Sequence, residues 1–361
     1  MTTASGAERP SVWNRASTRL LLATVGLGIF AFTLRDFDAA GFATLLGDRG
    51  AGLGLILIPH AIGSLLHTAG FRSLLRGFAP IVTTPPRWLF AKLHAIVLAS
   101  EAARMALPAG IIVGESVSLV GLTGNLQLRV SEALGILGMK KAWHLTAHSV
   151  WMVLLVSLGW HELRALGTNL REPWLAVVAA LLVTATLVTS GLGTLALITS
   201  SRAAALFTRV SAKIPLQSIR TWALGRLAEQ RSADTLHIDR AAHLRGAVFF
   251  TAQWGALVLE TFVILRLLGM PIQFTQALTL EMGVVMIRAL AFAVPGQVGV
   301  QDAGYVTILE ALHIQGATEL AVFFVLLRRG KEAFFIVVGF VLAAAARSRA
   351  KKVPSGNPSV S

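Results

Sequence analysis

Cysteine is absent from this chain of 361 residues, which excludes disulfides, thiolate chemistry and cysteine-ligated metals. Charged residues are scarce as well: they make up 14% of the sequence, whereas hydrophobic residues make up 55%. A soluble domain typically carries about 25% charged residues, and intrinsic disorder requires many charges and few apolar residues. The composition therefore argues against a soluble globular enzyme and excludes a disordered chain.

Several catalytic and cofactor motifs are also missing. The sequence contains no H-E-x-x-H zinc motif, no phosphate-binding P-loop and no nucleophile elbow of the hydrolase type. We therefore expect a protein that is not an enzyme, with no catalytic residues, no cofactor and no bound metal.

Acidic residues are outnumbered, because 18 Asp and Glu face 32 Lys and Arg, for a net charge of +14. Such an excess is typical of nucleic-acid binding, but here the basic residues lie between apolar runs, without a basic domain interleaved with aromatic residues. In that arrangement they act as topology signals and attract the anionic headgroups of a cytoplasmic leaflet. We expect membrane lipids as partners and no nucleic acid.

What the sequence does contain is apolar runs of roughly 17–25 residues, the length that crosses a ~30 Å hydrocarbon core as a helix. The fold class is therefore predicted to be all-α, a polytopic membrane bundle of about eight spans. The expected spans are 20–34, 51–71, 89–107, 142–160, 173–199, 246–269, 275–294 and 318–345. Two shorter apolar segments, 115–137 and 302–314, are interrupted by polar residues and are expected to be half-helices or re-entrant segments.

Basic residues mark the regions between the spans. A tail at 1–18, a loop at 200–245 and a tail at 346–361 carry Lys or Arg, and the positive-inside rule places all three in the cytoplasm. Residues 19–345 then form a single transmembrane domain. Within the loop, apolar residues at helical spacing indicate either an interfacial amphipathic helix or a solvated basic loop.

The two short segments decide the topology. Unless 115–137 and 302–314 each return the chain across the membrane, alone or as paired half-helices, the basic loop and the basic C-terminal tail face outward. Irregular backbone at this depth is tolerated only where it is buried in protein or lines a wet cavity.

Two similar breaks follow apolar spans. One runs from Pro108 to Glu115 and the other from Pro295 to Asp302, and in each a carboxylate lies seven residues after the proline. The glycines of the two breaks are Gly110, Gly114, Gly296 and Gly299. Because the preceding spans are expected to run in opposite directions, the breaks form an inverted repeat, and such repeats place a substrate site at their interface.

The chemistry of these breaks favours an anionic ligand. Proline ends a helix and glycine allows a sharp turn, so a helix that begins after the break points free N–H groups at the centre of the protein. Such a terminus binds anions, and a phosphate headgroup is a suitable ligand. Glu115 and Asp302 have two interpretations at this point: they bind substrate, or they only cap the new helices.

Further ionisable residues lie within the expected spans, where charges are costly and usually form pairs or line a pathway. They are Glu101 with Arg104, spaced i,i+3, and Glu281 with Arg288, spaced i,i+7. Each pair precedes one of the breaks and shares a helix face, although Arg104 and Arg288 alternatively extend to a membrane surface. His60 and His67, two turns apart, are interpreted as buried, hydrogen-bonded histidines.

The stretch Pro295-Gly-Gln-Val-Gly-Val-Gln-Asp302, followed by Leu327-Arg-Arg-Gly-Lys-Glu332, resembles the lysylphosphatidylglycerol synthase transmembrane region, also called the flippase-like domain family. The segment from Pro108 to Glu115 is similar to another motif of that family. The resemblance covers most of the chain and is closest to stand-alone members associated with hopanoid or other isoprenoid lipids. Asp302 departs from the family pattern, which usually has Glu, and Ala303 stands where a second small Gly is common.

The resemblance implies a protein of the cytoplasmic (inner) membrane that moves or handles lipids, with half-helices that meet at a central cavity. Family members that make aminoacylated phosphatidylglycerol carry an additional soluble aminoacyl-transferase domain. Because this sequence shows no such domain, we expect that synthase activity to be absent.

The leading hypothesis is a flippase or transport protein for a phospholipid or an isoprenoid, hopanoid-type lipid. The expected substrate-binding residues are Glu115, Asp302, Gln301, Arg104, Arg288, Arg328 and Arg329. The arginines neutralise phosphate in this hypothesis, since a guanidinium group binds it with two parallel hydrogen bonds.

Two alternatives stay open. One is a non-catalytic scaffold that holds lipid-biosynthesis enzymes through the loop 200–245, and the other is an intramembrane transferase that uses the paired acids. Small-residue helix faces are compatible with a homo-oligomer as well as with folding.

Overall fold

The computed structural model describes residues 24, 27–32, 34–35, 37–77, 86–107, 110–169, 171–172, 174–199, 239–290, 297–314 and 316–351. Within these ranges the regular secondary structure is entirely helical, which confirms the all-α class. The expected tail 1–18, most of the loop 200–245, the breaks at Pro108, Pro295 and Gly296, and residues 352–361 lie outside the described part of the chain.

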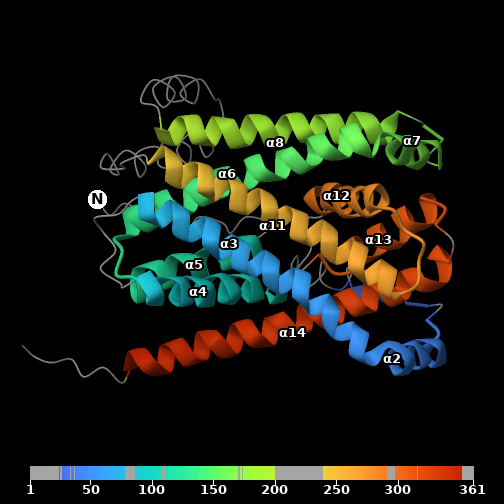
Figure 1. Ribbon diagram of the computed structural model, residues 1–361, viewed down its shortest axis with the longest axis horizontal. Helices are drawn as coiled ribbons and strands as arrows, with labels where there is room; N and C mark the ends of the chain where they lie inside the picture. The colour runs from blue at the N-terminus through green and yellow to red at the C-terminus, as the bar shows by residue number, and fades with distance from the viewer. Residues whose placement is uncertain are drawn as a thin grey trace, which may run out of the picture.

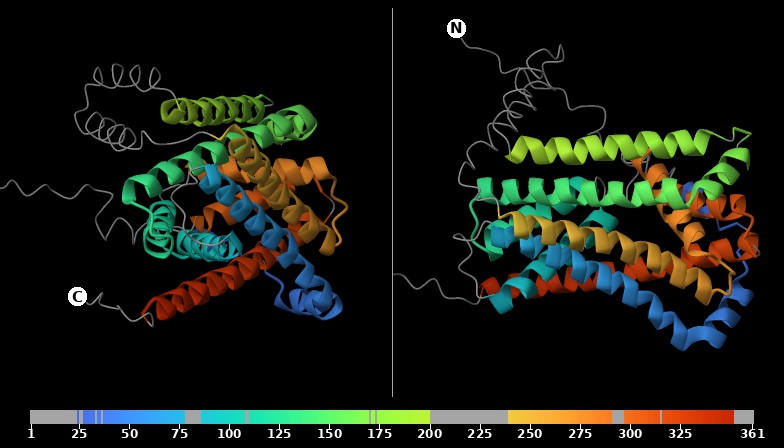
Figure 2. Two further views of the ribbon diagram at one scale, coloured as in Figure 1. Left: turned by 60° about the vertical axis from the view of Figure 1, so that its left-hand side comes forward. Right: turned by 45° about the horizontal axis from the view of Figure 1, so that its top comes forward.

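Long helices form the frame of the bundle. They are α3 (Leu57–Gly77), α6 (Val130–Leu158), α8 (Leu175–Thr199), α11 (Arg240–Leu267) and α14 (Ala317–Lys351). Figure 1 shows each of them running along the long axis of the molecule, and the two further views in Figure 2 show the same alignment. We call the end where α6 and α11 begin and α14 ends the basic end, because Arg129, Arg240 and Arg245 lie there.

The other described helices have 21 residues or fewer. They are α2 (Ala39–Leu53), η2 (Gly54–Ile56), α4 (Pro86–Ala106), α5 (Gly110–Asn125), α7 (Trp160–Asn169), α12 (Phe274–Leu290) and α13 (Val300–Ala311). Figure 1 places α7 and α2 at the end opposite the basic end.

Three described helices are long and apolar enough to cross a membrane, namely Gly54–Arg76, Leu175–Ala196 and Arg240–Leu267. A fourth is added if α6 and α7, which are bent by 79° at their junction, count as one broken span. The predicted count of eight spans is therefore not confirmed. Helix α14 has the length but carries four charged side chains between residues 328 and 332, so its apolar run is interrupted.

Helices α4 and α5 form a hairpin. Lys92 Nζ at the start of α4 donates to the carbonyl of Asn125 at the end of α5 (3.2 Å), and Ser100 Oγ donates to the carbonyl of Gly114 (2.7 Å). The chain thus enters at the basic end and returns to it, with the tip of the hairpin inside the bundle (Figure 1).

Helices α12 and α13 form a second hairpin, at the opposite end. Gly304 of α13 lies against Ile287 of α12, and Ile308 of α13 lies against Gly283, so the two helices are antiparallel. Figure 1 shows this hairpin at the end of the bundle away from α4 and α5. Two hairpins that enter from opposite ends are the geometry that the inverted repeat predicts.

This arrangement corrects the predicted topology of the short segments. Helix α5 has 16 residues and α13 has 12, which at 1.5 Å per residue gives about 24 Å and 18 Å, too short for a ~30 Å core. Each packs beside the helix before it, so 89–107 and 275–294 are arms of hairpins, and neither is among the described helices that qualify as membrane spans. The chain leaves each hairpin at the same end of the bundle at which it entered. The basic segments therefore still lie together at one end.

Two helix boundaries also differ from the prediction. Helix α6 is continuous from Val130 to Leu158, without the break expected between 137 and 142. Lys140 lies in this stretch, and its ammonium group binds Glu115 of α5 instead of ending the helix. Helix α14 continues to Lys351, so the expected C-terminal tail begins later than residue 346.

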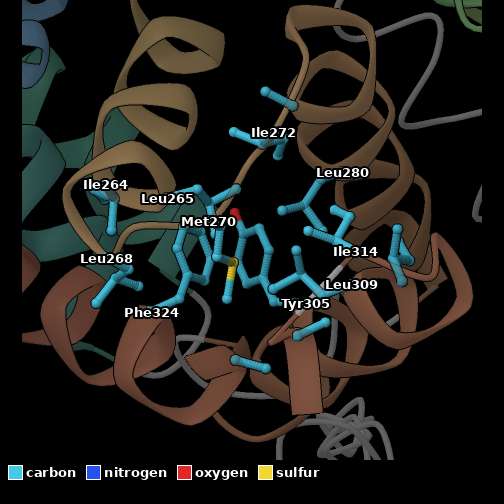
Figure 3. Packing of buried hydrophobic residues seen from close by; sticks show 14 of the residues in the cluster. Ile264, Leu265, Leu268, Met270, Ile272, Leu280, Tyr305, Leu309, Ile314 and Phe324 are labelled. Atoms are coloured by element: carbon cyan, nitrogen blue, oxygen red, sulfur yellow. The ribbon is translucent and has the colours of Figure 1, made fainter. Parts of the chain in front are cut away.

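The second hairpin is fixed by a buried apolar cluster between α11, α12, α13 and α14. Figure 3 shows Tyr305, Phe324, Met270 and Leu265 packed together within it. The rings of Tyr305 and Phe324 meet edge to face with centroids 5.1 Å apart. Tyr305 is fully buried, so its hydroxyl needs a hydrogen-bond partner. That partner is the buried carboxylate of Glu281.

Candidate functional site

Arg328 of α14 is the centre of a buried polar network. Its Nη2 donates to Glu281 Oε1 and its Nη1 donates to Thr261 Oγ1, both at 3.0 Å. Glu281 Oε2 in turn accepts hydrogen bonds from Thr261 Oγ1 (2.7 Å) and from the Tyr305 hydroxyl (3.1 Å). The guanidinium group also lies 4.7 Å from the centre of the Tyr305 ring. Helices α11, α12, α13 and α14 are thereby joined at one side chain.

A second branch of the network reaches α3. Glu260 of α11, which is 0% exposed, accepts a hydrogen bond from Lys331 Nζ (2.5 Å), and Arg328 Nη1 lies 3.5 Å from the same carboxylate. His60 Nδ1 lies 3.0 Å from Glu260 Oε2 and 3.2 Å from Lys331 Nζ. The prediction of a hydrogen-bonded, buried His60 is confirmed.

A third branch holds the tip of the second hairpin. Arg329 binds both oxygens of Asp302 with two parallel hydrogen bonds, at 2.9 and 2.8 Å, and binds Glu332 at 2.6 Å. Asp302 Oδ2 also accepts the backbone N–H of Gly299 (2.8 Å), which has φ = 82°, a conformation that suits glycine. The capping interpretation is confirmed for Asp302, which caps α13 and pairs with Arg329 at the same time.

Every cation in these three branches is paired with at least one carboxylate. The network contains the cations Arg328, Arg329 and Lys331 and the carboxylates Glu260, Glu281, Asp302 and Glu332. Buried charges are tolerated only when they are paired and hydrogen-bonded. Nearly all polar atoms of this network have such a partner. Two buried nitrogens of this network, Arg328 Nε and His60 Nε2, have no hydrogen-bond partner among the described atoms, and Glu332 Oε1 lies 4.0 Å from Arg328 Nε.

Arg104 and Arg288 lie near the tips of the two hairpins and, among the described residues, form no hydrogen bond or ion pair with that network. Arg288 Nε donates to Gln297 Oε1 at 2.7 Å, and Gln297 Nε2 donates back to the Arg288 carbonyl at 3.2 Å. Arg104 is paired with Glu101 at 3.4 Å, as the i,i+3 spacing predicts, and 44% of its side chain is exposed. The positive charges of Arg104 and Arg288 are close enough to repel each other.

A further cationic pair lies on α6. Lys140 Nζ binds Glu115 Oε2 at 3.0 Å and lies 5.3 Å from the Phe71 ring, and the charge of neighbouring Lys141 acts on both Glu115 and Arg104. Glu115 lies more than one turn into α5, which begins at Gly110, so it is not at a capping position. Its contact with Lys140 joins the first hairpin to the bundle.

The two hairpin regions therefore differ in their charge balance. Four cations (Arg104, Lys140, Lys141 and Arg288) lie around the first hairpin and the end of α12; Glu101 and Glu115 pair with two of them, and the charges of Glu281 and Glu332 in the buried network also act on Arg288. Within the described part of the chain, no carboxylate lies within 4.0 Å of Arg288, whose nearest hydrogen-bond partner is the neutral Gln297. We call these four side chains the cationic set.

The structure thus separates the predicted site residues. Arg328, Arg329 and Asp302 come together in the buried network, Arg104 and Arg288 lie at the hairpin tips, and Glu115 pairs with Lys140. Gln301 is buried on α13 beside Asp302. Of the predicted hinge glycines, Gly110 and Gly114 lie where α5 crosses closest to α4.

Sequence reasoning missed Glu260 and Lys331 as members of the network. Both are charged residues inside expected spans, the signal that identified Arg104 and Glu281, so the same rule applied throughout finds them. The expected partnership of Glu281 with Arg288 is not seen, because Glu281 binds Arg328. His67 makes ring contacts with His144 and Phe250.

Taken together, the apolar helices, the two opposed hairpins and the intramembrane charges define a class: an all-helical integral membrane protein with broken helices meeting at its centre. The chain belongs to the lysylphosphatidylglycerol synthase TM region family, whose family model matches residues 18–339. Membership identifies it as a membrane protein related to lipids and confirms the resemblance in the sequence. Comparison with curated proteins and with solved structures found no match.

Proposed function

We propose that this protein is a lipid flippase or lipid-transport protein that binds an anionic headgroup between the tips of its two hairpins. The observation that carries the proposal is that Arg104 and Arg288, one near the tip of each hairpin, repel each other, while Arg288 is hydrogen-bonded to the neutral Gln297 and, among the described residues, to no carboxylate. Two like charges in a low-dielectric interior are unfavourable unless an anion lies between or beside them.

A phosphate suits this place better than an uncharged group. Only two of the four cations of the cationic set are paired with a carboxylate among the described residues, and arginine binds phosphate oxygens with two hydrogen bonds. In this proposal Arg104 and Arg288 contact the headgroup, whereas Arg328 and Arg329 hold the buried carboxylates. A phospholipid or a phosphorylated isoprenoid fits the set, and an uncharged hopanoid-type lipid leaves it unneutralised.

The same charges support an orientation. The positive-inside rule favours a cytoplasmic position for the basic end, where α8 and α14 end and α11 begins. We propose that the protein lies in the cytoplasmic membrane with both termini inside, and that the first hairpin enters from the cytoplasm.

We further propose that the lipid is moved without chemical conversion. Glu115 and Asp302, the acids of the transferase hypothesis, are each bound to a separate cation, Lys140 and Arg329, and so do not form a shared acid–base pair. The scaffold hypothesis depends on the loop 200–245, of which only residues 239–245 are described, and it stays a prediction.

The test is lipid translocation in proteoliposomes. Wild-type protein is expected to equilibrate fluorescent phosphatidylglycerol across the bilayer, and Arg104→Gln/Arg288→Gln is expected to slow this at least tenfold, since each lost contact removes about 1.5–3 kcal/mol of charged hydrogen bonding. The rate follows from dithionite quenching of the label in the outer leaflet.

The matched control is Arg164→Gln/Arg245→Gln, which removes the same charge from two exposed sites, a ring contact with Trp174 and a loose pair with Asp239. It is expected to keep the wild-type rate. Equal rates for Arg104→Gln/Arg288→Gln and wild type would reject the headgroup site. Failure of folded wild-type protein to move phosphatidylglycerol or a labelled isoprenoid phosphate would reject the transport function itself.

A further inference from the structure

Three histidines lie in a row between α3, α6 and α11, next to the cationic set. The rings of His67 and His144 are 5.7 Å apart, and His144 and His148 both lie against Trp254, at 5.3 and 4.1 Å. His148 stacks on the Trp254 ring with an interplanar angle of 13°. We call His67, His144 and His148 the histidine row.

The row contains polar atoms without partners. His144 Nδ1, His148 Nε2 and Trp254 Nε1 are buried and have no hydrogen-bond partner among the described atoms. Buried nitrogens are rarely left unpaired, because each costs about 1–3 kcal/mol. An imidazole nitrogen in this position is therefore available for a proton. The described residues hold no group of three or more His, Asp and Glu that could bind a metal ion.

The surroundings of the row are mostly positive. The ionisable groups that act on its members from neighbouring helices are His94 and Arg104 of α4, Lys140 and Lys141 of α6, and Arg288 of α12. Glu115 of α5 is bound to Lys140, and α11 faces the row with the rings of Phe250 and Trp254. A positive charge on one of these imidazoles is opposed first by its burial and then by repulsion from these cations.

We infer that the histidine row takes up a proton when an anionic headgroup binds at Arg104 and Arg288. The inference rests on the proposed function and adds a coupled ligand, the proton, to the same site. The anion offsets the positive charge around the row, so that a buffer proton binds to an imidazole nitrogen and converts it to imidazolium. No other bond forms or breaks.

Linkage gives the sign of the pH dependence. If the anion favours protonation, protonation favours the anion by the same factor. The affinity for the headgroup therefore rises as the pH falls, by up to about tenfold per pH unit for one linked proton. A headgroup that is released where the pH is higher then carries a proton with it, which couples lipid movement to a proton gradient.

The experiment measures binding of dioctanoyl phosphatidylglycerol to the full chain in detergent by calorimetry. Buffers of different ionisation enthalpy report the number of protons taken up. The measurements run from about pH 5 to pH 8, the range in which histidine titrates. The phosphodiester is ionised throughout, so proton uptake reports on the protein. Wild type is expected to take up about one proton per lipid. The variant His144→Gln/His148→Gln is expected to take up none and to bind with an affinity independent of pH. His161→Gln, exposed on α7, is the matched control and should behave as wild type.

The outcomes separate the two proposals. Lipid binding by wild type without proton uptake would overturn the coupling and leave the proposed function standing. Undiminished uptake by a folded His144→Gln/His148→Gln variant would overturn the assignment to the row. If that variant does not fold, the proton uptake of His148→Gln alone is compared with that of wild type, and undiminished uptake again overturns the assignment to the row. Absence of lipid binding by folded wild type at every pH would overturn both proposals.

Discussion

Replacing Arg328 by alanine is expected to cost about 3–5 kcal/mol of unfolding free energy, the range for a buried ion pair that loses one partner. Arg328 hydrogen-bonds Glu281 and Thr261 and lies 3.5 Å from Glu260, and both carboxylates are almost completely buried. Without the guanidinium group, Glu281 keeps only the hydroxyls of Thr261 and Tyr305. Denaturant or thermal unfolding of the purified protein in detergent measures the change.

Two comparisons make this prediction specific. Arg129→Ala removes an arginine whose side chain is 85% exposed and whose pair with Glu132 is loose, at 3.8 Å, so it is expected to change stability by less than about 0.5 kcal/mol. The double variant Arg328→Met/Glu281→Leu removes both charges and is expected to be more stable than Arg328→Ala, since no buried charge is left unpaired. If the unfolding free energy of Arg328→Ala lay within about 1 kcal/mol of the wild-type value, the network would not be what holds these helices together.

The substitution Gly110→Ala is expected to open the first hairpin. A Cβ atom at this position would lie 1.9 Å from the carbonyl oxygen and 2.8 Å from the carbonyl carbon of Arg104. Both are backbone atoms, so the clash is relieved only if the start of α5 moves away from α4. Overpacking typically costs about 1–3 kcal/mol, and we expect about 3 kcal/mol here because no flexible side chain can yield.

The same displacement moves Arg104, so lipid translocation by any folded Gly110→Ala protein is expected to fall well below the wild-type rate. Gly124→Ala is the matched control on the same helix, since a Cβ there meets nothing within 4 Å. It is expected to be neutral or slightly stabilising, because alanine is the better helix former. Unfolding in detergent and the translocation rate are measured for both variants. Equal stability of the two would contradict a tight hairpin tip.

Much of the local structure was predictable. Apolar runs predicted the all-helical class, and the Pro- and Gly-containing breaks predicted where helices end and begin again: α4 ends at Ala106 and α5 begins at Gly110. Charges within the expected spans pointed to Arg104, Glu281 and Arg288 as residues with partners or ligands. The family itself was recognisable from the motifs at 295–302 and 327–332.

The direction of the short helices was not predictable from the same pattern. An apolar helix of 16 residues has the same hydropathy whether it continues across a membrane or folds back, and only its packing against α4 decides. The eight predicted spans include the hairpin arms 89–107 and 275–294, and the segment 115–137 is separated from the span 142–160 by a break that α6 does not have.

The sequence by itself determined the helical class, the breaks and the intramembrane charges, because helix length, proline, glycine and charge are properties of consecutive residues. Only the tertiary structure decided which charge meets which. Arg328 and Thr261 are 67 residues apart, and His60 and Lys331 are 271 residues apart. Such partners are selected by the packing of five helices, and that packing is what placed Arg328 among carboxylates.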